Sequence, residues 1–207
     1  MLLHKIKILL ILLSVSFLIM SMKYNEVIVD SDMTFEKAIE GTKAPQSVID
    51  DLVLLDLEYY STDGNIHRGQ LIVSKSVRHD IEDIFKMMLD MKFVINKMQP
   101  IVKYNWSDDA SMRDNNTSGF NYRYIAGTKR LSNHSFGRAV DINPKWNPVI
   151  HKNGKLSPAN GNYDTTRNGT FYTKHPIVLE FKKRGWRWGG DFKKYRDNHH
   201  FDFIGKK

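Results

Sequence analysis

The sequence predicts an α+β fold in which a central antiparallel sheet is flanked by helices. Two observations support this class: β-branched and apolar residues gather in short runs, and one longer segment has helical periodicity instead. With 207 residues, of which 41% are hydrophobic, the chain is long enough for one sizeable core and short for two. We therefore expect one folded domain over residues 51–207, preceded by an N-terminal extension.

A β-hairpin is expected at the start of this domain. Residues 52–60 and 70–73 are apolar and β-branched, as strands usually are. Residues 61–65 between them are turn-forming types that include Asp63 and Gly64. The two strands should therefore pair through this turn.

Two helices are expected to cover the sheet. Residues 78–93 carry apolar side chains at the i, i+3, i+4 and i+7 spacing of an amphipathic helix. A second, short helix is expected over residues 177–184, because it begins after Pro176 and ends before Gly185. The core-facing positions of the first helix are Ile81, Ile84, Phe85 and Met88.

The N-terminus has the order of a secretory signal. Lys5 and Lys7 precede an apolar run over residues 8–20, which is shorter than the roughly 20 residues of a spanning helix. No clear cleavage motif follows, so residues 1–22 are expected to be either a signal peptide or a membrane anchor. Both interpretations predict export from the cytoplasm. Residues 23–50 are mixed and polar, and we interpret them as a linker or short helix between the N-terminal run and the domain, without a role in chemistry.

Histidines and carboxylates gather in two short runs, residues 132–141 and 197–201. A catalytic zinc ion takes three protein ligands from His, Asp, Glu or Cys and leaves a fourth position for water. Because the chain has no cysteine, a metal must be held by nitrogen and oxygen. We expect one zinc ion per chain, bound by His134, Asp141 and His200.

The spacing in the first run supports this ligand set. Gly137 allows the backbone to turn sharply after His134. The segment that follows alternates as a strand does, which directs Asp141 away from the apolar face. One turn and one strand therefore bring an imidazole and a carboxylate together.

The second run contains two adjacent histidines, of which only one can be a ligand. Alternation places His199 on the same face as Phe201 and puts His200 on the opposite face. The three-residue offset from Asp197 also favours His200 as the ligand.

The two runs together carry a family resemblance. The pattern Ser-x-His-x-x-Gly-x-Ala-x-Asp, followed by Asp-x-x-His-Phe, resembles the M15 family of zinc D-Ala-D-Ala carboxypeptidases and L-alanyl-D-glutamate peptidases. The second branch is the more similar, because it also shows Asn-Asn-Thr-Ser, Tyr-Arg and Asn-Pro motifs. These stand here at residues 115–118, 122–123 and 147–148, and the similarity extends over residues 59–203.

The resemblance implies an activity, a fold and a role for each site residue. It implies a zinc peptidoglycan peptidase with the fold of the hedgehog and DD-peptidase type, in which His134, Asp141 and His200 bind zinc. Asp197 is then the general base. Arg123 is expected to bind a substrate carboxylate or a developing oxyanion, because its guanidinium is always charged.

Two further residues are expected on the substrate side of the site. Ser132 stands two residues before His134 and is expected to bond a ligand or the substrate backbone. Trp188 belongs to the Gly-Trp-Arg-Trp-Gly-Gly run at residues 185–190 and is expected in the wall of a cleft.

Several functional alternatives stay open. The bond between L-Ala and D-Glu of the stem peptide is the expected target, and removal of the terminal D-Ala is the alternative. A non-catalytic cell-wall-binding domain is another, since a fold does not by itself secure activity. Asp197 argues against it, because a pure binder needs no base. A nuclease with a histidine-rich metal centre explains neither the N-terminal run nor the spacing.

The charge of the chain favours an anionic partner. Its net charge is +8 and its pI is about 9.5, but the lysines and arginines are dispersed and form no nucleic-acid-binding motif. We therefore expect peptidoglycan stem peptides and the anionic cell wall as partners, and no nucleic acid. A monomer is expected.

Overall fold

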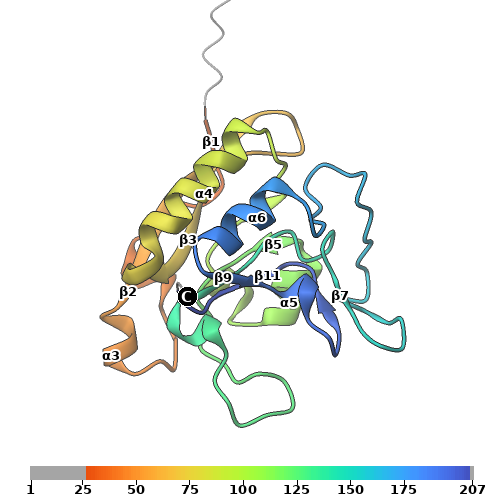
Figure 1. Cartoon of the computed structure of the whole chain (residues 1–207). Coiled ribbons are helices and arrows are strands. Elements are labelled where there is room, and N and C mark those ends of the chain that lie inside the picture. Colours follow the sequence, from red (N-terminus) through yellow and green to blue (C-terminus); the bar gives the residue numbers. More distant parts are fainter. Residues whose placement is uncertain (1–26, 206–207) are drawn as a thin grey trace, which may run out of the picture.

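The computed structural model describes residues 27–205, which form a mixed α+β fold of small sheets and short helices (Figure 1). The expected signal peptide or anchor over residues 1–22 lies outside the described residues. Within residues 27–205, no helix is both long and apolar enough to cross a membrane. In chain order the elements are β1 (Ile28–Val29), α2 (Phe35–Ala38), α3 (Gln46–Ile49), β2 (Leu52–Tyr60), β3 (Ile66–Ser74), α4 (Arg78–Asp90), β4 (Lys97–Met98), α5 (Asp108–Arg113), β5 (Asn116–Thr117), β6 (Ala139–Asp141), β7 (Val149–Ile150), β8 (Leu156–Ser157), α6 (Pro176–Lys183), β9 (Trp186–Trp188), β10 (Arg196–Asp197) and β11 (His200–Phe203).

The expected hairpin is present as β2 and β3. The two strands pair antiparallel along their full length, from Leu52 opposite Ser74 to Tyr60 opposite Ile66. β3 begins four residues earlier than the sequence pattern indicates, because the pairing continues up to the turn. β1 adds a short parallel strand on the other side of β3.

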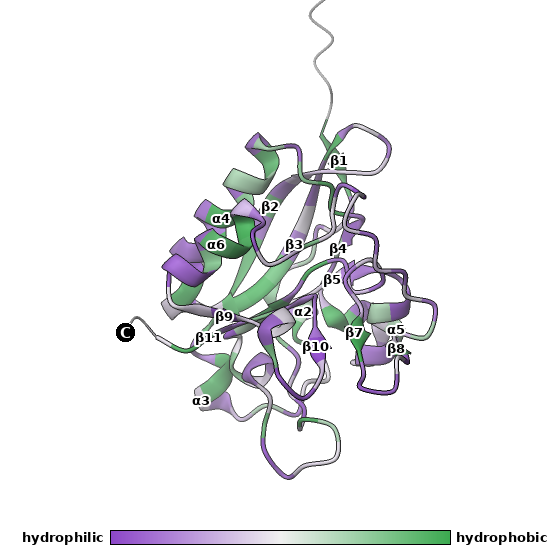
Figure 2. Cartoon of the chain, turned by 45° about the vertical axis from the view of Figure 1, so that its right-hand side comes forward, coloured by the Kyte–Doolittle hydropathy of each residue, from purple (hydrophilic) through white to green (hydrophobic). Residues whose placement is uncertain are grey.

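The two expected helices lie side by side (Figure 1), with α4 packed on β2 of this sheet and α6 next to α4. The four core-facing side chains of α4 are at most 1% exposed, and they pack in one cluster with Leu55, Leu57 and Tyr59 of β2. Figure 2 shows the hydrophobic stretch of β3 next to α4 and α6. α6 has Pro176 in its first turn, and the His175 side chain accepts a hydrogen bond from the Ile177 N–H at its start.

A second three-stranded sheet, in the order β6-β11-β9, lies beneath α6. β11 is its central strand and pairs antiparallel with both neighbours, so Phe201 stands opposite Val140 on one side and Trp188 on the other. These three side chains are at most 2% exposed and belong to the main core. Instead of one central sheet, residues 27–205 contain three three-stranded sheets and a two-stranded one.

The described part of the segment expected to be a linker, residues 27–50, contacts the rest of the fold. α2, α3 and the loop between them pack on the far side of the hairpin, where Ala38 is fully buried with Ile72 and Phe120. The Trp106 indole N–H donates to the Glu40 carbonyl and fastens this loop. The apolar side chains that form the contact are Met33, Phe35, Ile39, Ala44 and Val48.

Candidate metal centre

Two of the expected metal ligands face each other across neighbouring strands. Asp141 at the end of β6 stands directly opposite His200 at the start of β11. Opposite residues of an antiparallel pair project to the same side of the sheet, with Cβ atoms about 4.5–5.5 Å apart. The Oδ1 atom of Asp141 accordingly lies 2.9 Å from Nδ1 of His200.

The third expected ligand lies on a 3₁₀ turn, η3 (Asn133–Phe136). The Ser132 hydroxyl caps this turn by accepting from the backbone N–H of His134 at 3.3 Å. Gly137 ends it in the left-handed region, with φ of +63°, and a Cβ there would lie 2.4 Å from the backbone nitrogen of Ser74. The turn thus requires glycine, as the sequence predicts.

The three ligand atoms form a compact group. Nε2 of His134 lies 3.1 Å from Oδ2 of Asp141 and 3.2 Å from Nδ1 of His200. A tetrahedral zinc ion with ligands at about 2.0–2.1 Å requires separations of roughly 3.3 Å between them. The two imidazole nitrogens and the carboxylate therefore match zinc in donor type, and one ligand atom from each residue lies within 4.8 Å of the others, so the group could hold a metal ion.

The ring of His134 is oriented by the backbone. Its Nδ1 atom lies 2.6 Å from the carbonyl oxygen of Gly119, which can only accept a hydrogen bond. Nδ1 therefore donates to this carbonyl, and Nε2 is the ring atom that faces Asp141 and His200. A carbonyl that fixes the tautomer of a histidine in this way is characteristic of metal sites.

The charges in the group reinforce one another. Burial alone would raise the pKa of Asp141, yet the neighbouring His134 and His199, together with hydrogen bonds from His134 and His200, hold it well below its usual value. Burial lowers the pKa of His200, but the hydrogen bond to Asp141 and the nearby carboxylates outweigh burial and raise it to about 9. Asp141 thus presents an ionised carboxylate at the centre of the group.

The imidazole of His199 lies between Asp197 on β10 and Asp141. Nε2 of His199 is 3.0 Å from Oδ1 of Asp197 and 4.0 Å from Oδ1 of Asp141. Nδ1 of His199 is directed at the Asn147 carbonyl, 2.8 Å away. His199 is therefore engaged beside the group, and His200 is the histidine whose nitrogen belongs to it.

The carboxylate of Asp197 has spare bonding capacity. Its Oδ1 atom is buried and accepts no recognised hydrogen bond from residues 27–205, and its nearest polar neighbour is Nε2 of His199 at 3.0 Å. A buried carboxylate oxygen in this state is suited to accept a bond from water or a ligand.

Arg123 lies next to η3 through its backbone, while its side chain is directed elsewhere. Its carbonyl accepts from the Ser132 N–H at 3.0 Å, and its own N–H donates to the Ser135 hydroxyl. Its guanidinium pairs with Asp108 at 2.9 Å. Within residues 27–205, the structure shows no ion pair or hydrogen bond between this guanidinium and the three-residue group.

Trp188 lies in the core instead of in the wall of a cleft. It is 2% exposed, and its indole N–H donates to the Asn198 carbonyl at 2.9 Å. The exposed residue of β9 is Arg187, which points to the other face of the sheet. The alternation of β9 therefore directs both tryptophans inward.

One residue beside the metal group was missed by sequence reasoning. Asp202 is 1% exposed and lies 4.0 Å from Nε2 of His200. Its carboxylate accepts from Arg187 and from Asn133, so it links β9, β11 and η3. Alternation along β11 puts Asp202 on the same face as His200, and that pattern could have identified it.

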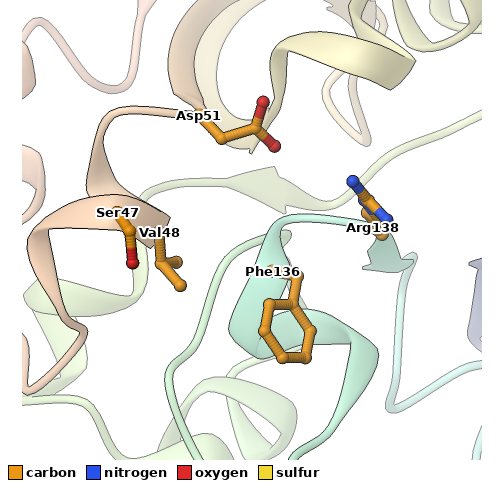
Figure 3. A pocket seen from close by; sticks show the side chains of 5 residues that line it. All are labelled: Ser47, Val48, Asp51, Phe136 and Arg138. Carbon is orange, nitrogen blue, oxygen red and sulfur yellow. The ribbon is translucent and has the colours of Figure 1, made fainter.

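A cavity of about 260 Å³ borders η3 on the side of the N-terminal segment. Phe136 and Arg138 line one side, and Ser47, Val48 and Asp51 line the other (Figure 3). In Figure 3, Arg138 and Asp51 face one another across this space. The turn that carries a metal ligand is therefore bounded by residues of α3 and the loop after it.

Two histidines and one aspartate with a second carboxylate nearby are the donor set and base that zinc-dependent hydrolases use. Residues 126–203 match the model of a family described as D-alanyl-D-alanine carboxypeptidase. This match covers all three expected ligands and Asp197, and it supports assignment of the chain to the M15 peptidase family, as the sequence motifs imply. It does not distinguish the branches of that family. No curated protein and no solved structure matches the chain.

Proposed function

We propose that the chain is a zinc-dependent peptidase that hydrolyses an amide bond in the stem peptide of peptidoglycan. The observation that carries this proposal is the group formed by His134, Asp141 and His200, in which one ligand atom from each residue lies within 4.8 Å of the others. The family match supports the substrate class, because the matching family is described as D-alanyl-D-alanine carboxypeptidase.

Zinc bound by these residues would lower the pKa of a water molecule to about 7 and polarise the carbonyl of the scissile bond. The protein supplies the geometry for this chemistry. Two ligands are fixed on paired strands, and the third is fixed by the Ser132 cap, the Gly137 turn and the Gly119 carbonyl. The nitrogen and oxygen donors match the preference of zinc in the absence of cysteine.

Asp197 is the general base of the proposed reaction. It takes a proton from the attacking water and returns that proton to the leaving amine, so no covalent intermediate is required. The buried Oδ1 atom without a hydrogen bond supports this role, because it can accept a bond from the water. The presence of Asp197 beside the group argues against a purely wall-binding domain, which needs no base.

Arg123 acts on the substrate as a cation. Its position beside the backbone of η3 supports a role close to the metal group. Its guanidinium pairs with Asp108 through one NH2 group, and its Nε atom forms no hydrogen bond within residues 27–205. This Nε–H can therefore donate to a substrate carboxylate. Stabilisation of the carbonyl oxygen by Arg123 remains a prediction. Ser132 acts through the turn that it caps, and we propose no contact between Trp188 and substrate.

The bond between L-Ala and D-Glu is the proposed site of cleavage. The motifs at residues 115–118, 122–123 and 147–148 support this branch of the family. Removal of the terminal D-Ala is the second candidate. It is favoured by the match to a family described as D-alanyl-D-alanine carboxypeptidase. The proposed location is the cell wall, reached by export through residues 1–22 and favoured by the net charge of +8.

Digestion of purified peptidoglycan tests this proposal. Mass spectrometry of the muropeptides after incubation with zinc-loaded protein should show new N-terminal D-Glu for the endopeptidase, or loss of D-Ala alone for the carboxypeptidase. A chelator should stop the reaction, and added zinc should restore it. Intact muropeptides after incubation with protein that demonstrably contains zinc would refute the proposed activity.

A further inference from the structure

A second cavity, of about 300 Å³, lies outside the metal group. Three separate segments line it: residues 41–43 from the N-terminal extension, residues 105–106, and residues 121–123. It therefore joins the segment between α2 and α3 to the strand-like stretch that precedes η3.

The lining of this cavity is cationic. It contains the side chains of Lys43 and Arg123 and no carboxylate residue. Asp108 pairs with Arg123 at 2.9 Å but is not part of the lining. Lys43 forms no ion pair with any residue of the range 27–205, and it is exposed. The cavity thus holds one cation that is partly neutralised and one that is available.

Arg123 also retains a donor for a ligand. Its Nε atom is buried and finds no hydrogen-bond partner within residues 27–205. Arginine is a donor only, with five N–H groups in a fixed plane, so a buried Nε–H without an acceptor is unfavourable until an acceptor binds. An anion with two oxygen atoms would satisfy this donor and offset the charge of Lys43.

The walls of the cavity are held in place by packing. Trp106 stands edge-on against Phe120 with 5.9 Å between ring centroids, and its indole N–H holds the carbonyl of Glu40. Gly41, next in the chain, has a left-handed φ of +76° and passes close to the Trp106 indole. Lys43 is therefore presented by a turn that an aromatic side chain anchors.

The cavity shares a stretch of backbone with the metal group. The N–H of Asn121 donates to the carbonyl of His134 at 3.1 Å, and two residues earlier the Gly119 carbonyl holds the imidazole of His134. A molecule bound along residues 121–123 is thus in contact with the segment that positions a metal ligand.

We propose that this cavity binds a carboxylate of the peptide substrate and that Lys43, in the N-terminal segment, supplies the second cation of the subsite. This inference rests on the proposed function for the identity of the substrate, and it adds the segment around residue 43 to the substrate site. The ligand class is an acidic peptide whose carboxylate lies near the scissile bond. This carboxylate is either that of a glutamate residue in the peptide or that of the peptide's C-terminus.

Variants of Lys43 test the proposal. Lys43→Gln removes the charge, Lys43→Arg keeps it, and Lys37→Gln on α2 is the matched control. Lys37 belongs to the same segment, but it is 68% exposed, pairs with Glu40 and does not line the cavity. All variants should be made in the full chain, and thermal unfolding should verify that each is folded.

Two measurements should be compared across these variants. The first is the affinity of a synthetic stem peptide for the full chain by calorimetry, with and without zinc. The second is the determination of KM and kcat, each by itself, for hydrolysis of the same peptide. Peptides amidated at the glutamate carboxylate, or at the C-terminus, identify which carboxylate is bound.

Lys43→Gln should raise both Kd and KM of the acidic peptide about three- to tenfold, the range of one partly exposed charge contact, and leave kcat unchanged. Lys43→Arg should restore affinity, and Lys37→Gln should behave as wild type. For the peptide that lacks the relevant carboxylate, Lys43→Gln and wild type should not differ.

The inference would be overturned if Lys43→Gln and Lys37→Gln bound every peptide equally, or if wild type bound none of them. Its failure is distinguishable from failure of the proposed function. Weakened binding by Lys43→Gln without hydrolysis would refute the peptidase and support the subsite. Normal hydrolysis with no effect of Lys43→Gln would support the peptidase and refute the subsite.

Discussion

Zinc should stabilise the folded protein, and His200→Ala should remove most of that stabilisation. The three ligand atoms come from η3, β6 and β11, so an unfolded chain has no comparable site. A ligand that binds only the folded state at 100 times its Kd stabilises it by about 2.7 kcal/mol. For a domain of 150–250 residues each kcal/mol raises Tm by about 2–4 °C, so wild type should gain about 5–11 °C.

His199→Gln is the matched control for this measurement. It changes the neighbouring buried histidine, and its amide can still donate to the Asn147 carbonyl that now accepts from Nδ1 of His199. We expect His199→Gln to keep most of the zinc-induced shift and His200→Ala to show less than about 2 °C of it. The assay is differential scanning calorimetry at pH 7.5 with and without zinc, together with metal analysis of each protein. A zinc-induced shift that survives in His200→Ala but disappears in His199→Gln would refute the ligand set.

Three further predictions follow from single contacts. Asp197→Asn should keep zinc but lower kcat on peptidoglycan about 10²–10⁴-fold, the usual worth of proton transfer, and a rate near wild type would exclude it as the base. Burial lowers the pKa of His175 from 6.5 to about 4, so the neutral cap on Ile177 is fully stabilising above pH 6.5 and is lost as the pH falls toward 4. His175→Ser should remove this pH dependence from urea unfolding curves recorded at pH 7.5 and 4.5, and curves that stay as pH-dependent as wild type would contradict it. Phe201→Ala should cost about 3–5 kcal/mol of unfolding free energy in urea, because Phe201 is fully buried and stacked on Phe181, whereas a cost below about 1 kcal/mol would contradict this packing.

The parts of the fold that the sequence predicts are those with a local periodic signal. The apolar spacing of α4 and the turn residues between β2 and β3 depend only on neighbours along the chain, and both elements are present. Local signals set the ends less well. α4 stops at Asp90, and Lys92 then takes a left-handed φ of +51°, whereas the pattern extends to residue 93.

Pairing between distant segments has no such local signal. The sequence indicates that Asp141 and His200 each lie on a strand, but it does not show that these strands are neighbours in register. The carbonyl of Gly119 that orients His134 is likewise invisible, because every residue has a carbonyl. From the sequence, the metal group is predictable only as a set of residue types within a motif. The distances between the ligand atoms are set by the pairing of distant segments in the fold.

The packing of residues 27–50 was not predictable for a different reason. Its sequence is polar on average, but its apolar residues contact one patch formed by Ile72, Phe120 and Trp106. A short helix such as α2 has too few residues to show a clear period, so composition dominates the interpretation. Charge and hydropathy averages therefore hide a packed segment of this length.

Hydrogen bonds of Ser74 connect the turn that ends at Gly137 to the N-terminal segment. The Ser74 N–H at the end of β3 donates to the Gly137 carbonyl, and the Ser74 hydroxyl donates to Asp51, which follows α3. Gly137 in turn ends the 3₁₀ helix that carries His134. Displacement of the N-terminal segment would therefore act on the position of a metal ligand as well as on the cationic cavity. Because β6 and β11 hold the other two ligands independently of that segment, such a displacement should weaken metal binding through His134 while Asp141 and His200 stay paired.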